Sequence, residues 1–387
     1  MIDFNNLKTA FFDKSDTDLN RAYLLFKSMS NPFVSKILTG LIQFSLKLHL
    51  PIKTIIKATV YKQFCGGETI EESQATIDKL WKSKIGTILD FSAEGKESIN
   101  DFNRTLAQTL ASIEKVSISD NIPFSVFKPT GLCKFSILEK INNNTPLSAD
   151  EEIEKKEYEA RINAICQLAH DKNVAVFIDA EESWIQDAID SIAEKMMEKY
   201  NHKKALIYNT IQLYRNDRTT YLNTLLERSE NKFFVGVKLV RGAYHEQEIA
   251  RAKAKNYPCP VHTIKENTDT DYNTALKLCI KNIDRVSVCA GTHNENSAQL
   301  LANLMEEHGL NKNDERVYFS QLLGMSDHIS YNLSVDNYNV SKYVPYGPVR
   351  DVLPYLIRRA EENTSIAGQM GRELSNIIAE KKRRKNS

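Results

Sequence analysis

Short apolar runs alternate with amphipathic segments along the chain from about residue 85 onward. Eight of these runs have the length and residue types of buried strands: 86–91 (GTILDF), 124–129 (FSVFKP), 174–179 (VAVFID), 205–212 (ALIYNTIQ), 235–241 (VGVKLVR), 285–292 (RVSVCAGT), 317–322 (VYFSQL) and 340–346 (VSKYVPY). Helical patterns lie between them, at 150–170, 182–200, 221–230, 272–281 and 295–308. Continuous apolar strands separated by helices are typical of a parallel sheet that is covered on both faces.

Two architectures can hold such a sheet. A doubly wound open sheet that binds a dinucleotide normally carries a glycine-rich turn after its first strand, and the sequence has no GxGxxG motif. Eight strands that alternate with helices instead match a (β/α)8 barrel. We therefore predict an α/β fold with two parts, which are an N-terminal helical arm over residues 1–84 and a (β/α)8 TIM barrel over residues 85–387 that ends in a C-terminal helix.

The arm is predicted to be helical in three places. Residues 19–26 belong to one helix and residues 33–50 to a second, and a third begins after Gly66 and Gly67, where Thr69 precedes two glutamates in the manner of a helix N-cap. The sequence of the arm contains no pattern of catalytic residues. We therefore expect the arm to pack against the barrel or to form a surface for a partner.

The stretch 343–363 (YVPYGPVRDVLPYLIRRAEEN) leads from the last predicted strand, through a Pro-Tyr-Gly-Pro turn, into a helix from about Val349. One face of this helix is apolar and consists of Val349, Val352, Leu353, Leu356 and Ala360. The opposite face carries Tyr355, Arg358, Arg359 and Glu362. Two neighbouring guanidinium groups suit a carboxylate or a phosphate, since each is a planar fork of donors. The alternative is a solvated face with Arg–Glu pairs at helical spacing.

Composition and charge narrow the functional class. Apolar residues make up 42% and charged residues 26% of the 387, and the net charge is +1, which fits a globular protein and argues against a nucleic-acid binder. The basic run 381–385 is expected to be a frayed, solvated helix end, or alternatively a contact with anionic lipid. The six cysteines form no CxxC pair, so neither a zinc site nor a disulfide framework is expected, and no other cluster has metal-ligand spacing.

The N-terminal residues lack the pattern of a signal peptide, and they include acidic residues that a transit peptide avoids. The most apolar stretch, 33–50, is interrupted by Lys36, Gln43 and Lys47, so it is not expected to cross a bilayer. We expect a cytoplasmic protein.

Polar side chains gather at the carboxyl ends of the predicted strands, where barrels of this class carry their active sites. These residues are Lys128, Asp179, Gln212, Lys238, Arg241, Thr292, His293 and Gln321. Any one of them could belong to a structural ion pair, but their repeated occurrence at equivalent positions favours a site. With Lys265 and the two arginines of the last helix, cations outnumber acids there. The site is expected to take an anionic substrate and a phosphate-bearing cofactor.

The sequence does not contain an HExxH motif or a Ser–His–acid order. A Schiff-base lysine is conceivable, because Lys128 and Lys238 both belong to predicted barrel strands. The array is better suited to orienting a cofactor that performs the chemistry itself.

Several motifs together resemble the proline dehydrogenase family: IDAEES (178–183), KLVRGAYHEQE (238–248), GTHNENS (291–297), QLLGMSD (321–327) and YVPYGPV…YLIRRAEEN (343–363). The resemblance extends over about residues 85–363 and is closest to the stand-alone mitochondrial type. It implies a flavin-dependent, distorted (β/α)8 barrel that oxidises L-proline to Δ1-pyrroline-5-carboxylate, the first step of proline catabolism. Hydride transfer to flavin N5 is implied, and electrons would pass to a quinone, which requires peripheral contact with a membrane.

The resemblance also assigns residues by matching motif. Arg358, Arg359 and Lys128 would bind the proline carboxylate, and Asp179 would hold Lys128. Tyr343, Tyr355 and Leu322 would pack on the pyrrolidine ring, and Glu362 would orient the arginines. FAD would be bound by Ala180, Gln212, Lys238, Arg241, Gly242, Ala243, Thr263, Lys265, Thr292 and His293. No metal is implied.

One departure and three rival functions remain. Many bacterial members have arginine where this chain has Lys238, and a lysine there cannot make the same bidentate contact. Hydroxyproline dehydrogenases share the whole framework of these motifs. They carry a smaller residue in place of Tyr343, so Tyr343 favours proline as the substrate. A lyase using Lys128 as a Schiff base and a non-catalytic flavin or amino-acid sensor are the rivals of other classes.

Overall fold

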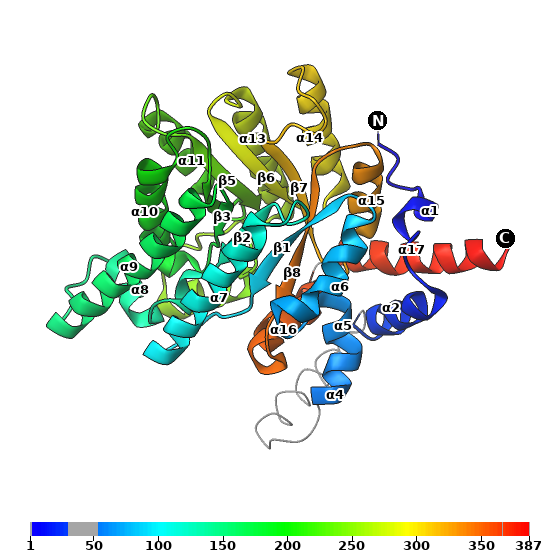
Figure 1. The fold of residues 1–387 in the computed structure, drawn as a ribbon, viewed down its shortest axis with the longest axis horizontal. Coiled ribbons are helices and arrows are strands. Elements are labelled where there is room, and N and C mark those ends of the chain that lie inside the picture. The colour runs from blue at the N-terminus through cyan, green and yellow to red at the C-terminus, as the bar shows by residue number, and fades with distance from the viewer. Residues whose placement is uncertain (1, 30–52, 366, 387) are drawn as a thin grey trace.

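The computed structural model describes residues 2–29, 53–365 and 367–386, without the side chains of Lys53 and residues 360–370. Eight parallel strands form a closed barrel in sequence order (Figure 1). They are β1 Ile85–Phe91, β2 Phe124–Phe127, β3 Ala175–Ile178, β4 Ile207–Gln212, β5 Val235–Val240, β6 Val286–Gly291, β7 Val317–Leu322 and β8 Val340–Tyr346. Each of the eight predicted strands is present, β7 and β8 with the predicted bounds, so the (β/α)8 prediction is confirmed.

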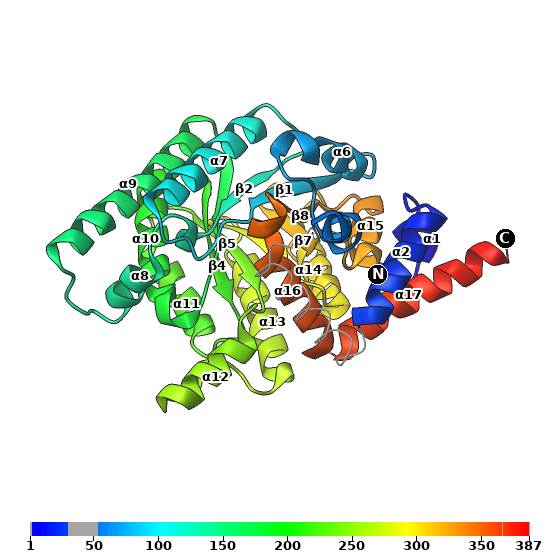
Figure 2. The ribbon, with the colours of Figure 1, turned by 90° about the horizontal axis from the view of Figure 1, so that it is seen from below.

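Helices follow the strands and cover the outside of the barrel (Figure 2). They are α7 Ile99–Ser117, α8 Phe135–Asn142, α9 Ala149–Asp171, α10 Ser183–Tyr200, α11 Arg218–Arg228, α12 His245–Lys255, α13 Lys265–Lys281, α14 Glu295–Glu307, α15 Asp327–Val335 and α16 Val349–Ser365. The apolar side chains between helices and strands form the largest core cluster. Burial of this continuous apolar surface is what closes the helices onto the barrel.

The interior of the barrel is filled by a separate cluster from alternating strand positions, including Phe124, Phe177, Tyr208 and Tyr343. The ring of Phe124 stacks on that of Phe177 at 4.3 Å and meets Tyr208 edge-on at 5.6 Å. Because aromatic side chains occupy this part of the interior, the barrel is a packed core and not a pore.

The remaining helices lie beside the barrel, where helices from the N-terminal part of the chain pack against those from the C-terminal part. In the arm these are α1 Leu7–Ala10, α2 Asp16–Met29, α4 Lys53–Ile56, the π-helical turn η1 Lys57–Tyr61, α5 Lys62–Phe64 and α6 Ile70–Trp81. Thr69 is the N-cap of α6, as predicted, with its side chain accepting from the Glu72 N–H at 3.2 Å. The helix predicted over 33–50 lies outside the described residues.

The C-terminal helix α17 (Ala367–Lys385) lies along α2, with both next to α1 (Figures 1 and 2). Residues of α2, η1, α5, α16 and α17 share one apolar cluster. The basic end of α17 is not frayed, contrary to expectation, because Arg384 pairs with Glu380 and Asp16 and donates to the carbonyl of Phe11 at 2.9 Å. Within the described ranges, we find no helix with the length and apolarity needed to cross a membrane.

Candidate active site

Five buried polar side chains from different strands meet at the carboxyl end of the barrel. Nζ of Lys128 lies 2.8 Å from both carboxylate oxygens of Asp90 and 3.2 Å from Oδ2 of Asp179. Asp179 also forms an ion pair with Lys238 and accepts a hydrogen bond from the Tyr343 hydroxyl at 2.6 Å. Nζ of Lys238 lies over the Tyr343 ring, 4.7 Å from its centre. The predicted pairing of Asp179 with Lys128 is therefore present, and Lys238 joins it.

The cluster is stable although it is buried, because its positive and negative side chains alternate. Burial alone would lower the pKa of Lys128, but Asp90 and Asp179 outweigh it, so the pKa is raised above its ordinary value. Burial opposes ionisation of Asp179 as well, yet Lys238 and Lys128 lower its pKa below the usual range. Lys128 and Asp179 are therefore charged at neutral pH, since each has an opposite charge within 3.2 Å.

The two arginines of α16 lie at the same end of the barrel. Arg358 makes a bidentate pair with Glu94, in which Nη2 lies 2.9 Å from Oε2, and its guanidinium stacks over Tyr244 at 5.7 Å. Arg359 is buried, with its guanidinium 5.0 Å from the centre of the Tyr355 ring. The solvated-face alternative is wrong for Tyr355, Arg358 and Arg359. The side chain of Glu362, which was predicted to orient the arginines, lies outside the described residues.

Glu94 connects the arginine helix with the lysine cluster. Burial on its own would raise the pKa of the Glu94 carboxyl group. The nearby charges of Arg358 and Lys128 outweigh burial, so the pKa is lowered overall. Leu322 makes a second connection, because it packs against the barrel-interior cluster of Tyr343 and against the arm cluster of Tyr355. The predicted substrate residues other than Glu362 are therefore gathered at one end of the barrel.

A second polar group surrounds the end of β5. Arg241 pairs with Asp269 at 2.7 Å and donates to Oγ1 of Thr292 at 2.7 Å, and Lys265 pairs with the other oxygen of Asp269 at 2.8 Å. Gly242 follows with a φ of +132°, and a side-chain carbon there would overlap the ring of Tyr214. Only glycine fits this backbone position without strain. The sequence Arg-Gly thus combines a fixed cation with main chain that packs closely against the Tyr214 ring.

His293 and Gln212 complete the predicted cofactor set inside the barrel rim. Nδ1 of His293 lies 2.9 Å from Oγ of Ser326, and burial, followed by Lys342, Arg359 and Arg241, lowers the pKa of His293 to about 3. Nε2 of Gln212 donates to the carbonyl of Glu181 at 2.9 Å, while its buried Oε1 has no partner in the described part of the chain. Ala180 is half-buried, and Ala243 and Thr263 are exposed.

Four acidic residues of these networks were not predicted: Asp90, Glu94, Asp269 and Asp327. Asp90 had a signal, since it is a charged residue inside an apolar strand run. Glu94 and Asp327 had no comparable signal, because each lies in or beside a connecting loop and its partner is far away in the sequence. Asp327 pairs with Lys342 of β8 at 2.9 Å and with Lys14 of the arm at 3.1 Å.

Comparison with known proteins identifies the family. A model of the family described as proline dehydrogenase matches residues 73–372. "Proline dehydrogenase 1, mitochondrial" of Dictyostelium discoideum is 32% identical over 97% of this chain and 74% of its own length. "Hydroxyproline dehydrogenase" of Xenopus laevis is 30% identical over 96% of this chain and 88% of its own.

The fold is also found among solved structures. The crystal structure of proline utilization A (PutA) from Bdellovibrio bacteriovorus, inactivated by N-propargylglycine, aligns with 95% of this chain at a TM-score of 0.73 and 20% sequence identity. The chain spans 40% of that longer protein, so this likeness bears on the fold alone. The matched family model and the relatives that cover nearly the whole chain lead to one conclusion: this protein belongs to the proline dehydrogenase family of oxidoreductases.

Proposed function

We propose that the barrel mouth binds FAD and oxidises L-proline to Δ1-pyrroline-5-carboxylate, and that a quinone takes up the electrons. The observation that carries this proposal is the buried group of Lys128, Asp179, Lys238 and Tyr343 beside the arginines of α16. A charged substrate can enter such a place because fixed, oppositely charged partners replace its hydration.

The substrate carboxylate would be held by Arg358, Arg359 and Lys128. Two guanidinium forks and an ammonium group offer more donors than one carboxylate needs, which fixes its orientation. Asp90 and Asp179 keep Lys128 in place and charged, so that it acts as a positioned donor. The rings of Tyr343 and Tyr355, with Leu322 between their clusters, would form the apolar walls around the pyrrolidine ring.

The second polar group fits FAD on features of the chain itself. The orphaned Oε1 of Gln212 offers an acceptor for a ring N–H. Arg241, Lys265 and the neutral His293 would address the pyrophosphate and the ring system, with Thr292, Ala180, Ala243, Thr263 and Lys238 beside them. The chemistry that FAD supplies when bound is acceptance, at flavin N5, of a hydride from the ring carbon next to the nitrogen.

An anaerobic visible spectrum, recorded before and after addition of L-proline, tests the proposal. A flavin band at about 450 nm that bleaches with proline is the expected result. Bleaching with trans-4-hydroxyproline but not with proline would assign the chain to the sister activity named in the Xenopus relative. A colourless protein that does not take up added FAD would refute a flavoenzyme.

The position of Lys128 between Asp90 and Asp179 argues against the lyase alternative. A Schiff base requires a neutral amine, whereas Lys128 lies between two carboxylates that raise its pKa. Tyr343 argues for proline over hydroxyproline, because its bulk is fixed at the mouth by the hydrogen bond to Asp179.

The remaining expectations stand as part of the same proposal. Residues 1–84 would be an arm that is separate from a catalytic domain of residues 85–387. Transfer of electrons to a quinone would bring a protein of the cytoplasm into peripheral contact with a membrane. Co-sedimentation with liposomes that contain quinone, with proline as electron donor, tests that contact.

A further inference from the structure

The loop between β7 and α15, residues 323–326, and its flanking residues Leu322 and Asp327 are held by side chains from elsewhere. Lys342 of β8 donates to the carbonyls of Leu322 at 3.3 Å and Met325 at 2.5 Å. Gln63 of α5 donates to the carbonyl of Gly324 at 3.1 Å. The N–H of Ser326 donates to Oε1 of Glu373, on α17, at 2.5 Å. The arm, the last strand and the C-terminal helix thus all bind one loop.

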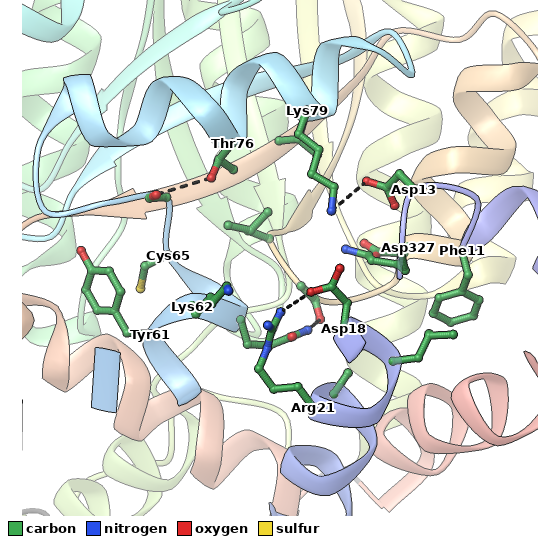
Figure 3. Close-up of a pocket in the computed structure, with 18 of the residues that line it drawn as sticks. Phe11, Asp13, Asp18, Arg21, Tyr61, Lys62, Cys65, Thr76, Lys79 and Asp327 are labelled. Atoms are coloured by element: carbon green, nitrogen blue, oxygen red, sulfur yellow. Dashed lines mark hydrogen bonds and ion pairs between the residues drawn. The ribbon is translucent and has the colours of Figure 1, made fainter. Parts of the chain in front are cut away.

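Such bonds are needed because packing on one side of the loop is incomplete. A partly open cavity of about 410 Å³ lies between the loop, α2, α5, α6 and α17 (Figure 3). Several charged residues of its lining pair with one another, as Lys79 with Asp13 at 3.5 Å and Arg21 with Asp18 at 3.0 Å. Because packing is incomplete on this side, directed polar bonds contribute to holding the loop.

Asp327 anchors the end of the loop. Its carboxylate lies between Lys342, which is fully buried, and Lys14 of the arm. Burial opposes its charge, but Lys14 and Lys342 lower the pKa of Asp327 well below its usual range. A buried carboxylate with two cations at 2.9 and 3.1 Å cannot shift without leaving a charge uncompensated.

The other side of the loop faces the proposed FAD site. Ser326 has a left-handed backbone, with a φ of +51°, which is unfavourable for a residue other than glycine or asparagine. Its backbone N–H is bound by Glu373, and its side-chain Oγ lies 2.9 Å from Nδ1 of His293. One residue therefore connects the C-terminal helix to the histidine at the rim.

We infer that Glu373 is a positioning residue: by binding the N–H of Ser326 it holds the strained loop, and through Oγ of Ser326 it fixes the ring of His293. This inference rests on the proposed function only for what His293 binds. It gives α17 a part in the site, beyond its packing on the arm.

Three variants separate this role from ordinary helix stability. Glu373→Ala removes the acceptor, and Glu373→Gln keeps an acceptor oxygen of similar reach. Glu380→Ala removes another buried acid of α17, which forms ion pairs with Arg383 and Arg384. The full-length protein, stripped of flavin and labelled with 15N at its eight histidines, gives a ring-nitrogen NMR spectrum. His293→Gln assigns the His293 signals.

We expect Glu373→Ala to move the His293 ring-nitrogen signals, and Glu373→Gln and Glu380→Ala to leave them at the wild-type positions. Titration of FAD into the same apo proteins should then give a dissociation constant raised about tenfold in Glu373→Ala only, which corresponds to the loss of about one hydrogen bond. Unchanged His293 signals in Glu373→Ala, or equal changes in Glu380→Ala, would overturn the inference. If the histidine signals behave as expected but no variant binds FAD, the proposed function fails and the positioning of His293 stands.

Discussion

The hydroxyl of Tyr343 donates to Oδ2 of Asp179 over 2.6 Å, which joins β8 to the end of β3. These strands are not neighbours in the barrel, since β8 pairs with β1 and β7. The bond therefore spans the barrel mouth, and Lys128 and Lys238 converge on the same carboxylate. A tyrosine at this position thus orders the buried charges as well as adding bulk.

Replacing Tyr343 with phenylalanine removes this bond and leaves the ring. We expect the free energy of unfolding to fall by about 1–3 kcal/mol, because a bond to a charged acceptor is lost in a buried place. We expect kcat/KM for proline to fall roughly tenfold, since Asp179 and its lysines lose a fixed partner. Urea unfolding and steady-state kinetics measure the two effects.

Tyr346 provides the matched control on the same strand. Its side chain is buried, but its hydroxyl has no hydrogen-bond partner within the described residues. Tyr346→Phe should therefore leave the free energy of unfolding and kcat/KM for proline nearly unchanged. Equal losses in the two variants would show that the Tyr343 hydroxyl has no particular importance.

Arg358→Lys tests whether the planar fork at this position binds substrate. Lysine keeps the charge but cannot make the bidentate pair that Arg358 makes with Glu94. We expect KM for proline to rise at least about tenfold, with a smaller change in kcat. Arg104→Lys is the control, because Arg104 is half-exposed and pairs with Asp351 at 3.4 Å. An unchanged KM in Arg358→Lys would remove Arg358 from the proposed carboxylate site.

Gly242→Ala tests the close packing of the main chain beside Arg241 on the Tyr214 ring. The added carbon would overlap the Tyr214 ring at a backbone angle that favours glycine, so we expect a stability loss of about 3 kcal/mol and a lower FAD content per chain. Gly309→Ala is matched for positive φ, at +66°, but its side chain would point into open space. It should cost about 1 kcal/mol and leave FAD content unchanged. Absorbance ratios at the flavin and protein bands, with thermal melts, give both values.

The lowered pKa of His293 predicts a dependence of stability on pH. Burial, together with nearby Lys342, Arg359 and Arg241, moves it from 6.5 to about 3, so the unfolded chain binds a proton below pH 6.5 that the folded chain does not. Stability is therefore lost progressively as pH falls from about 6.5 towards 3. Between pH 7.5 and 5.5 the wild type should lose up to about 1 kcal/mol more than His293→Gln in urea unfolding. Equal losses would contradict the shift.

The sequence alone determined the barrel and much of its mouth. Apolar runs that alternate with helical patterns report burial on both faces of a strand, so all eight strands and the start of α16 were predictable. Charged residues inside such runs, as at Lys128 and Lys238, must be compensated, which indicated a site before any contact was known.

Which charged residues pair with one another is decided by the tertiary structure. Lys128 is bound by Asp90, 38 residues away, and Arg358 by Glu94, 264 residues away. No local pattern encodes such pairs, because they depend on how the barrel closes and where α16 crosses its mouth. Likewise Glu373 reaches Ser326 only because α17 returns to the loop after β7. Periodicity thus reports which surfaces are buried, whereas the matching of buried charges is fixed by the closed fold.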